Sequence, residues 1–234
     1  MNIFSKIRRK LIKLRLQPIR VFCFHQVSES FDSSTMWECD WTQIEQFKRN
    51  ILQLKTQYEF ISLVDATEKL KHDTFRLKKY AVLTADDGWE SLKNIIPWLM
   101  GNKVPVTLFV NPAYLDGKHY QERETEKLLT KQDLKEWSEM YKEYVSIASH
   151  GWNHAKISEL SIEQFEQGVL DSEKELAEIP SKVPYFAFAY GIFTMDSIKI
   201  LRKYNLCPVL VDGGKNYRYD GYIHRECIDG LNIK

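Results

Sequence analysis

Short apolar segments alternate with stretches of helical periodicity along this chain, and that alternation restricts the fold more than any other feature. A strand, a helix and a further strand in succession predict a parallel sheet, because the helix carries the chain back to the edge where the next strand begins. Periodicity alone leaves a closed barrel and an open doubly wound sheet as alternatives. The expected strands are Ile19–His25, Phe60–Val64, Tyr80–Thr84, Val104–Val110, Val145–Ala148, Pro184–Tyr190, Leu206–Val211 and Tyr222–Ile228. The expected helices are Trp41–Lys55, Asp65–Leu70 with Asp65 as its cap, Trp89–Met100, Lys131–Tyr141, Ser161–Ala177 and Asp196–Tyr204.

The strand Tyr80–Thr84 leads into two adjacent carboxylates and a glycine, Asp86, Asp87 and Gly88. Adjacent carboxylates at the mouth of a buried strand repel each other and resist desolvation, so a compensating charge is expected there. A bound cation is the usual solution. The alternative is an ordinary strand-to-helix turn, in which an aspartate caps the helix and the glycine takes the tight turn.

Two histidines four residues apart, His150 and His154, follow the strand Val145–Ala148. Neutral imidazoles at the end of a strand converge readily on one ion, as they do in zinc sites. Together with Asp87 they make a set of two histidines and one carboxylate, which is the ligand count of a catalytic metal site with a position left for water. The sequence therefore predicts a metal centre at the carboxyl ends of the strands.

The segments TADDG (Thr84–Gly88) and SHGWNH (Ser149–His154) together resemble the first two motifs of the polysaccharide deacetylases, the carbohydrate esterase family 4 type. The resemblance extends from the strand that carries His25 to the segment around Arg225. It implies an α/β fold, the distorted seven-stranded (β/α) barrel of that family. It also implies hydrolysis of an N-acetyl group on an N-acetylhexosamine, in a glycan or a glycan precursor.

Carried over by position, the family motifs imply that Asp86 is the catalytic base. They imply that Asp87, His150 and His154 hold a divalent metal and that metal-bound water is the nucleophile. We expect the metal to be Zn²⁺, with Co²⁺ or Ni²⁺ as alternatives. A divalent metal lowers the pKa of bound water to about 7 and polarises a carbonyl, which suits amide hydrolysis.

Two histidines are candidates for the acid that protonates the leaving amine. His25 ends the strand in FCFHQV, which resembles the start of the subgroup that deacetylates poly-N-acetylglucosamine, where the early histidine is the acid. His224 lies where other branches of the family carry a late histidine. The segment around it also resembles that subgroup's I-P-R-I pattern, with Arg225 matching its arginine. We favour His25 over His224.

The third motif departs from the family pattern. Tyr185–Gly191 (YFAFAYG) aligns with it, but Ala189 replaces the proline and the arginine that orients the catalytic aspartate is absent. We expect Arg225 to substitute for that arginine. Tyr190, Trp89 and Trp152 are the expected contacts for a sugar ring in the substrate groove.

Composition and charge restrict the binding partners and the cellular compartment that we expect for this protein. A formal net charge of +1 gives no case for nucleic-acid binding, and the four cysteines form no C-x-x-C pair. We divide the chain into a basic amphipathic segment at 1–18 and a catalytic domain at 19–234. Met1–Arg20 carries seven basic residues and no acidic one, so it suits either peripheral contact with an anionic membrane or a first helix that covers the core. Without a signal peptide or an apolar run long enough to span a membrane, we expect a cytoplasmic protein.

Two other functions are consistent with parts of this pattern. The altered third motif is compatible with a relative that binds carbohydrate and has lost its chemistry, although Asp86, Asp87, His150 and His154 are intact. Two histidines and a carboxylate also form the ligand set of non-haem iron oxygenases. Those enzymes usually have antiparallel scaffolds, which the alternation of strands and helices does not favour.

Overall fold

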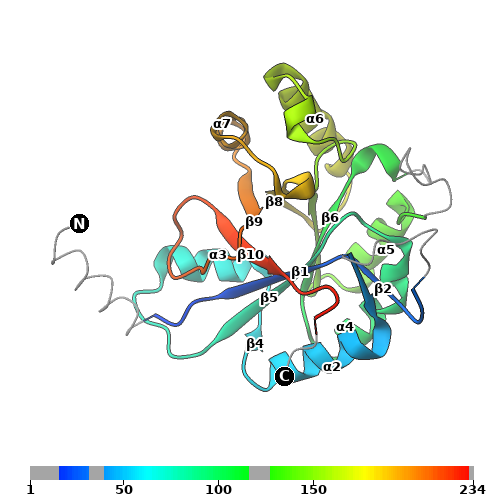
Figure 1. The fold of residues 1–234 in the computed structure, drawn as a ribbon, viewed down its shortest axis with the longest axis vertical. Helices are drawn as coiled ribbons and strands as arrows, with labels where there is room; N and C mark the ends of the chain where they lie inside the picture. The colour runs from blue at the N-terminus through cyan, green and yellow to red at the C-terminus, as the bar shows by residue number, and fades with distance from the viewer. Residues whose placement is uncertain (1–15, 32–39, 116–126, 232–234) are drawn as a thin grey trace.

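A computed structural model of the chain describes residues 16–31, 40–115 and 127–231. Seven parallel strands form a closed barrel, since β1 pairs with both β10 and β5 at the two ends of the strand order (Figure 1). The predicted seven-stranded (β/α) barrel is therefore confirmed. Its strands are β1 (Arg20–Phe24), β5 (Tyr80–Ala85), β6 (Val106–Val110), β7 (Val145–Ser149), β8 (Lys182–Ala187), β9 (Cys207–Val211) and β10 (Ile223–Cys227).

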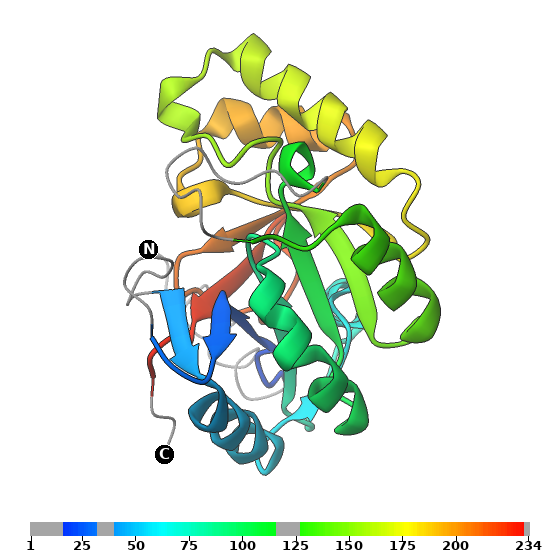
Figure 2. The ribbon, with the colours of Figure 1, turned by 90° about the vertical axis from the view of Figure 1, so that its right-hand side faces the viewer.

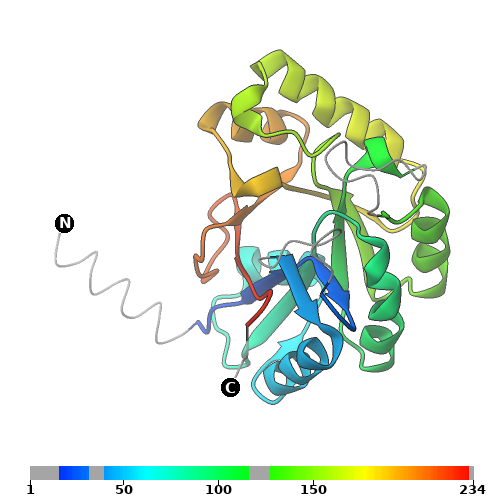
Figure 3. The same ribbon diagram turned by 45° about the vertical axis from the view of Figure 1, so that its right-hand side comes forward.

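Helices surround the barrel, as Figure 3 shows for α2, α4, α5 and α6. Helices α6 and α7 pack against each other beside β7 and β9 (Figure 2). The α-helices are α2 (Ile44–Lys55), α3 (Leu63–His72), α4 (Ile96–Gly101), α5 (Lys131–Met140), α6 (Ile162–Leu176) and α7 (Met195–Lys203). Short 3₁₀ turns lie at η2 (Glu90–Asn94), η3 (Pro112–Tyr114), η4 (Ile157–Glu159) and η5 (Ala189–Gly191). Three short strands complete the fold: β4 (Glu59–Phe60), which pairs with the start of β5, and the pair β2 (Gln26–Ser28) and β3 (Trp41–Gln43).

Each of the seven barrel strands contributes at least one apolar side chain to the barrel interior. These side chains belong to one buried cluster: Val21, Val82, Phe109, Ala148, Ala187, Val209 and Ile223. Successive residues of a strand face opposite sides, so Phe22 and Phe24 of β1 pack in a second cluster together with residues of the surrounding helices. By the same alternation, side chains that follow the interior layer by two positions along a strand also face the barrel axis, nearer its carboxyl mouth.

Two predicted elements are shorter than expected. The segment Trp89–Met100 is divided into η2 and α4, and Pro97 lies in the first turn of α4, where a missing N–H leaves no helical bond unmade. The expected strand Phe60–Val64 ends at Phe60, because Ser62 caps α3: its hydroxyl accepts a hydrogen bond from the Asp65 N–H at 3.0 Å. The prediction that Asp65 caps this helix was wrong. A capping box begins α6: the Ser161 hydroxyl accepts from the Gln164 N–H, and the Gln164 side chain accepts from the Ser161 N–H.

Two predictions fall largely outside the described residues. One is the basic helix within Met1–Arg20, of which the structure describes only the last part; there Leu16 and Ile19 are buried against the barrel. The other concerns Asn111–Thr130, whose charged and irregular sequence predicts a surface loop; its residues 116–126 are not described. In the described parts of the chain, no helix combines the length and apolar character needed to cross a bilayer.

Candidate active site

Polar and ionisable side chains meet at the carboxyl mouth of the barrel. His25 follows β1, the aspartates Asp86 and Asp87 follow β5, His150 follows β7, and Asp229 follows β10. Because all seven strands are parallel, their carboxyl ends lie at the same end of the barrel, where barrel enzymes place their catalytic groups.

Asp87, His150 and His154 converge on one point. The Oδ1 atom of Asp87 lies 3.2 Å from Nε2 of His150 and 3.2 Å from Nε2 of His154. Two ligand atoms bound to one tetrahedral zinc ion at about 2.0–2.1 Å are about 3.3 Å apart. The spacing of these three atoms therefore matches a shared cation.

The hydrogen bonds around the cluster also fit a cation. His150 Nδ1 lies 3.0 Å from the carbonyl oxygen of Ala187, which only accepts, so in the neutral ring the proton is on Nδ1 and the Nε2 lone pair faces Asp87. Asp87 Oδ1 is buried and accepts no hydrogen bond from the described residues. Two electron-rich atoms directed at each other in a buried site need a positive charge between them. The residues present thus fit a divalent metal.

Electrostatics within the cluster favour the ionised carboxylate. Burial alone would raise the pKa of Asp87, but in the cation-free site positive charge on His154 and hydrogen bonds from protonated His150 and His154 outweigh burial and hold the pKa well below its ordinary value. With both rings neutral, a bound cation supplies the positive charge instead. An ionised carboxylate is the form that binds a metal.

The backbone at this site is held in an uncommon conformation. Asp87 and Gly88 have φ of 68° and 75°, and His154 has φ of 55°. A Cβ atom at Gly88 would come within 3.0 Å of the Val110 side chain, so this position needs glycine for space as well as for conformation. Left-handed φ at a non-glycine residue costs on the order of 1–3 kcal/mol and persists where the surrounding structure enforces it. Two of the three cluster residues carry that strain.

Neighbouring groups orient the cluster. The indole N–H of Trp89 donates to Asp87 Oδ2 at 3.0 Å, and the Asn111 side chain donates to the carbonyl oxygen of His150 at 2.8 Å. Trp89 is 7% exposed, so its ring offers little face to a sugar. We expected Trp89 to contact substrate. In the structure its ring is buried and its indole N–H contacts the Asp87 carboxylate instead. The sequence reasoning missed Asn111, although it follows strand β6 as the aspartates follow β5.

Arg225 and Asp86 form a buried ion pair inside the barrel. The two terminal nitrogens of Arg225 donate to the two carboxylate oxygens of Asp86, each at 2.6 Å, and Nη1 also donates to the Thr84 hydroxyl at 3.0 Å. Burial raises the pKa of Asp86, but the charge and hydrogen bonds of Arg225, together with the charges of His150 and His25, outweigh burial, so the net shift is downward. The side chain of Arg225 is fully buried. The contact that we expected to replace the missing third-motif arginine is therefore present.

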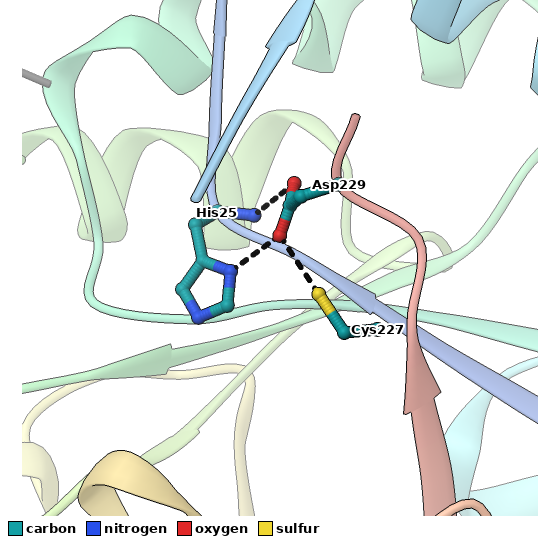
Figure 4. Close-up of side chains that lie close together, drawn as sticks. All are labelled: His25, Cys227 and Asp229. Atoms are coloured by element: carbon teal, nitrogen blue, oxygen red, sulfur yellow. Dashed lines mark hydrogen bonds and ion pairs between the residues drawn. The ribbon is translucent and has the colours of Figure 1, made fainter. Parts of the chain in front are cut away.

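His25 faces Asp86 from the end of the neighbouring strand β1 and is held by Asp229. Its Nε2 lies 4.0 Å from Asp86 Oδ2, while its Nδ1 lies 2.6 Å from Asp229 Oδ2 (Figure 4). The same Oδ2 atom accepts from the thiol of Cys227 at 3.0 Å. Burial lowers the pKa of His25, but Asp229 and Cys227 outweigh it and raise the pKa well above its ordinary value.

The sequence reasoning missed Asp229 and Cys227. A signal was present, since Asp229 follows the last strand in the same way that Asp86 and Asp87 follow β5. The two residues lie more than 200 positions from His25 in the chain, and no short motif connects them.

His224 lies away from this group. Its neighbour Arg225 points into the barrel, so His224 faces the outside, where its ring nitrogens lie 2.7 Å from Asp212 and 3.2 Å from Asp220. Of the two histidines considered as acids, the structure brings only His25 near Asp86.

The expected substrate contacts Tyr190 and Trp152 lie at different distances from the cluster. The Tyr190 ring packs on His154, with 4.6 Å between ring centroids, and half of its surface is exposed. Trp152 lines a cavity of about 270 Å³ between the loop after β7 and helix α6, which His150 also lines but neither Asp86 nor Asp87 does. Tyr190 is thus beside the candidate site, and Trp152 is at its periphery.

A closed parallel barrel with paired acidic and basic groups at the carboxyl ends of its strands has the architecture of a barrel enzyme of the α/β class. Residues 75–209, more than half of the chain, match the family model described as polysaccharide deacetylase. The chain belongs to this family. No curated protein sequence matches the chain.

Solved structures share the fold over nearly the whole chain. IcaB from Ammonifex degensii superposes with a TM-score of 0.79 at 19% identity, covering 92% of this chain and 94% of its own. A de-N-acetylase from Aggregatibacter actinomycetemcomitans gives a TM-score of 0.74 at 18% identity, with 93% and 97% covered. The Streptococcus pyogenes deacetylase PplD, solved with acetate, gives 0.73 at 18% identity, with 91% and 93% covered. At these identities the likeness establishes the fold.

Proposed function

We propose that this protein is a divalent-metal-dependent deacetylase that removes the N-acetyl group from an N-acetylhexosamine in a glycan or glycan precursor. One observation carries the proposal: Asp86 and His25 face each other 4.0 Å apart with pKa values shifted in opposite directions, beside the Asp87, His150 and His154 cluster. Two titratable groups whose surroundings push their pKa values apart are the usual arrangement of a base and an acid.

Asp87, His150 and His154 are the residues that would hold the cation, with Zn²⁺ as the leading candidate and Co²⁺ or Ni²⁺ as alternatives. When bound there, a divalent cation supplies Lewis-acid polarisation of the acetyl carbonyl and lowers the pKa of water. Trp89 fixes the orientation of the Asp87 carboxylate through its hydrogen bond to Oδ2.

Asp86 is the proposed base. It is not part of the three-residue cluster, and the bidentate contact with Arg225 fixes both of its oxygens in one plane. The same contact keeps the carboxylate ionised, which is the form that accepts a proton from the attacking water. Arg225 acts as a positioning residue for that base.

His25 is the proposed acid. Asp229 accepts from its Nδ1, which directs Nε2 towards Asp86 and stabilises the protonated ring. A histidine whose pKa is raised, so that its protonated form is favoured, and which faces the base is placed to give its Nε2 proton to the departing amine. Transfer of the proton to nitrogen makes the amine a leaving group and completes amide cleavage.

The proposed substrate is an N-acetylated sugar. Tyr190 has an exposed ring beside His154, which suits packing against a pyranose. Trp152 lines the neighbouring cavity beside helix α6 and is a candidate contact for a more distant part of a glycan. The family supplies the acetylated carbohydrate as the substrate class.

Acetate release from N-acetylglucosamine oligomers, measured with the metal content of the same samples, tests the proposal. We expect release by the zinc- or cobalt-loaded protein, loss after chelation, and loss in Asp86→Asn with metal retained. Oligomer binding without acetate release in any metal form would favour the carbohydrate-binding alternative. Activity that is rescued by zinc in the absence of oxygen would exclude an iron oxygenase.

A further inference from the structure

We propose that His25, Cys227 and Asp229 form a second metal site, distinct from the Asp87 cluster, which takes a zinc-like cation when the first site is already filled. Among the described residues, only these two groups of three bring potential ligand atoms within 4.8 Å of one another. The second group stands at the mouth of the barrel where β1 and β10 end (Figure 4).

Geometry places three different donor atoms around one point. Asp229 Oδ2 lies 2.6 Å from Nδ1 of His25 and 3.0 Å from Sγ of Cys227. Ligand atoms around zinc, at about 2.0 Å for nitrogen and oxygen and about 2.3 Å for sulfur, are roughly 3.3–3.5 Å apart. Movements of well under an ångström, within reach of side-chain rotation, would open the present contacts to that spacing.

The donor set selects the class of cation. One thiolate, one imidazole and one carboxylate suit Zn²⁺ and Co²⁺, whereas Mg²⁺ and Ca²⁺ prefer oxygen ligands alone. The side chain of Asp229 is fully buried, while that of His25 is 18% exposed, so the imidazole side offers the route of entry. With three protein ligands, a fourth position is left for water.

In the absence of a cation, hydrogen bonds hold the three side chains together. His25 Nδ1 and the Cys227 thiol both donate to Asp229 Oδ2. Cys23 lies opposite Cys227 on the neighbouring strand β1. A hydrogen bond between the two thiols, together with burial, raises the pKa of the Cys227 thiol, so the thiol keeps its proton until a metal displaces it. A bound cation removes the Nδ1 and Sγ protons and makes a thiolate outright.

Occupation of this site would withdraw the acid from catalysis; this consequence alone rests on the proposed function. With Nδ1 on the metal, the His25 ring is neutral and keeps one proton on Nε2, facing Asp86. A neutral imidazole is a much weaker acid than an imidazolium. Excess zinc would therefore inhibit the enzyme that a first equivalent activates.

Cobalt titration of the full chain tests the site without any substrate. The Asp87 cluster contains no sulfur, so a near-ultraviolet cobalt–thiolate charge-transfer band reports only a thiol-containing site. We expect no such band with the first equivalent of Co²⁺ and a band with the second. Cys227→Ser should lose the band and keep the first equivalent. Cys207→Ser, which changes another partly buried thiol, should keep both.

Two further variants make the result independent of the Cys227 substitution. Asp229→Asn should also lose the band, and His150→Ala should lose the first equivalent while the band remains. In wild type and in Cys227→Ser, the ratio of rates with and without excess zinc gives the inhibition, which we expect to disappear in Cys227→Ser. A wild-type protein that shows no band through excess cobalt, or a band that persists in Cys227→Ser, would overturn the proposal. Because the band needs no turnover, absence of deacetylase activity would leave this test intact.

Discussion

Arg225 binds both carboxylate oxygens of Asp86 at 2.6 Å, although the two residues are 139 positions apart in the chain. The contact crosses the barrel mouth from the last strand to the carboxyl end of β5. The contact is the one expected of Arg225 from the resemblance, because the third motif lacks the family's arginine. The pairing ties the proposed base to the closure of the barrel, because β10 completes the sheet beside β1.

Replacing Arg225 by alanine is expected to lower turnover and stability together. It leaves a buried carboxylate without its partner, which costs about 3–5 kcal/mol of folding free energy. Loss of the Arg225 charge raises the pKa of Asp86, so the acid limb of the kcat/KM profile should move to higher pH. Denaturant unfolding, metal analysis and pH–rate profiles check these effects; loss of metal from the variant would contradict a role confined to Asp86.

His25 and His224 offer a matched pair of substitutions. His25→Ala removes the proposed acid and should reduce kcat by about 10²–10⁴-fold with metal retained. His224→Ala removes a ring that contacts Asp212 and Asp220 outside the barrel and should leave kcat within a few-fold of wild type. A larger loss in His224→Ala than in His25→Ala would reverse the assignment of the acid.

Local signals in the sequence predicted a parallel sheet and placed candidate site residues at its strand ends, whereas the choice of a closed barrel over an open sheet came from the family resemblance. Each of Asp86, Asp87 and His150 lies just beyond the end of its own strand, and parallel strands bring such ends together. The pairing of Arg225 with Asp86 was also expected, from a motif that lacked its arginine.

The remaining parts of the site depend on contacts that local patterns do not encode. Asp229 reaches His25 only when β10 closes the barrel beside β1, so nothing near either residue in the chain indicates the pair. The burial of Trp89 depends on how the turn after Gly88 packs. The presence of a single aromatic residue in a sequence does not show whether its ring is buried against a carboxylate or exposed to a sugar.

Trp89→Phe is expected to weaken metal binding without removing a ligand. The substitution keeps an aromatic ring and deletes the N–H that donates to Asp87 Oδ2 at 3.0 Å. Loss of an outer hydrogen-bond partner typically reduces metal affinity by about 10–100-fold. Competition with a chelator of known affinity measures the change, and Asp87→Ala, which should abolish binding, sets the lower limit. Unchanged affinity in Trp89→Phe would mean that the loop alone orients the carboxylate.

Asp229→Asn is expected to shift the pH dependence of catalysis in one direction. His25 must be protonated to act as the acid, and Asp229 raises its pKa by accepting from Nδ1 and by its negative charge. The raised pKa keeps the acid protonated to higher pH, so activity in wild type falls only as pH rises through that value. The asparagine amide in Asp229→Asn lacks the negative charge of the Asp229 carboxylate. The pKa of His25 should therefore fall, and the alkaline limb of kcat/KM should move to lower pH. The acid limb, which reports Asp86, should stay in place, since Arg225 is untouched. An alkaline limb that does not move in Asp229→Asn would assign it to a group other than His25.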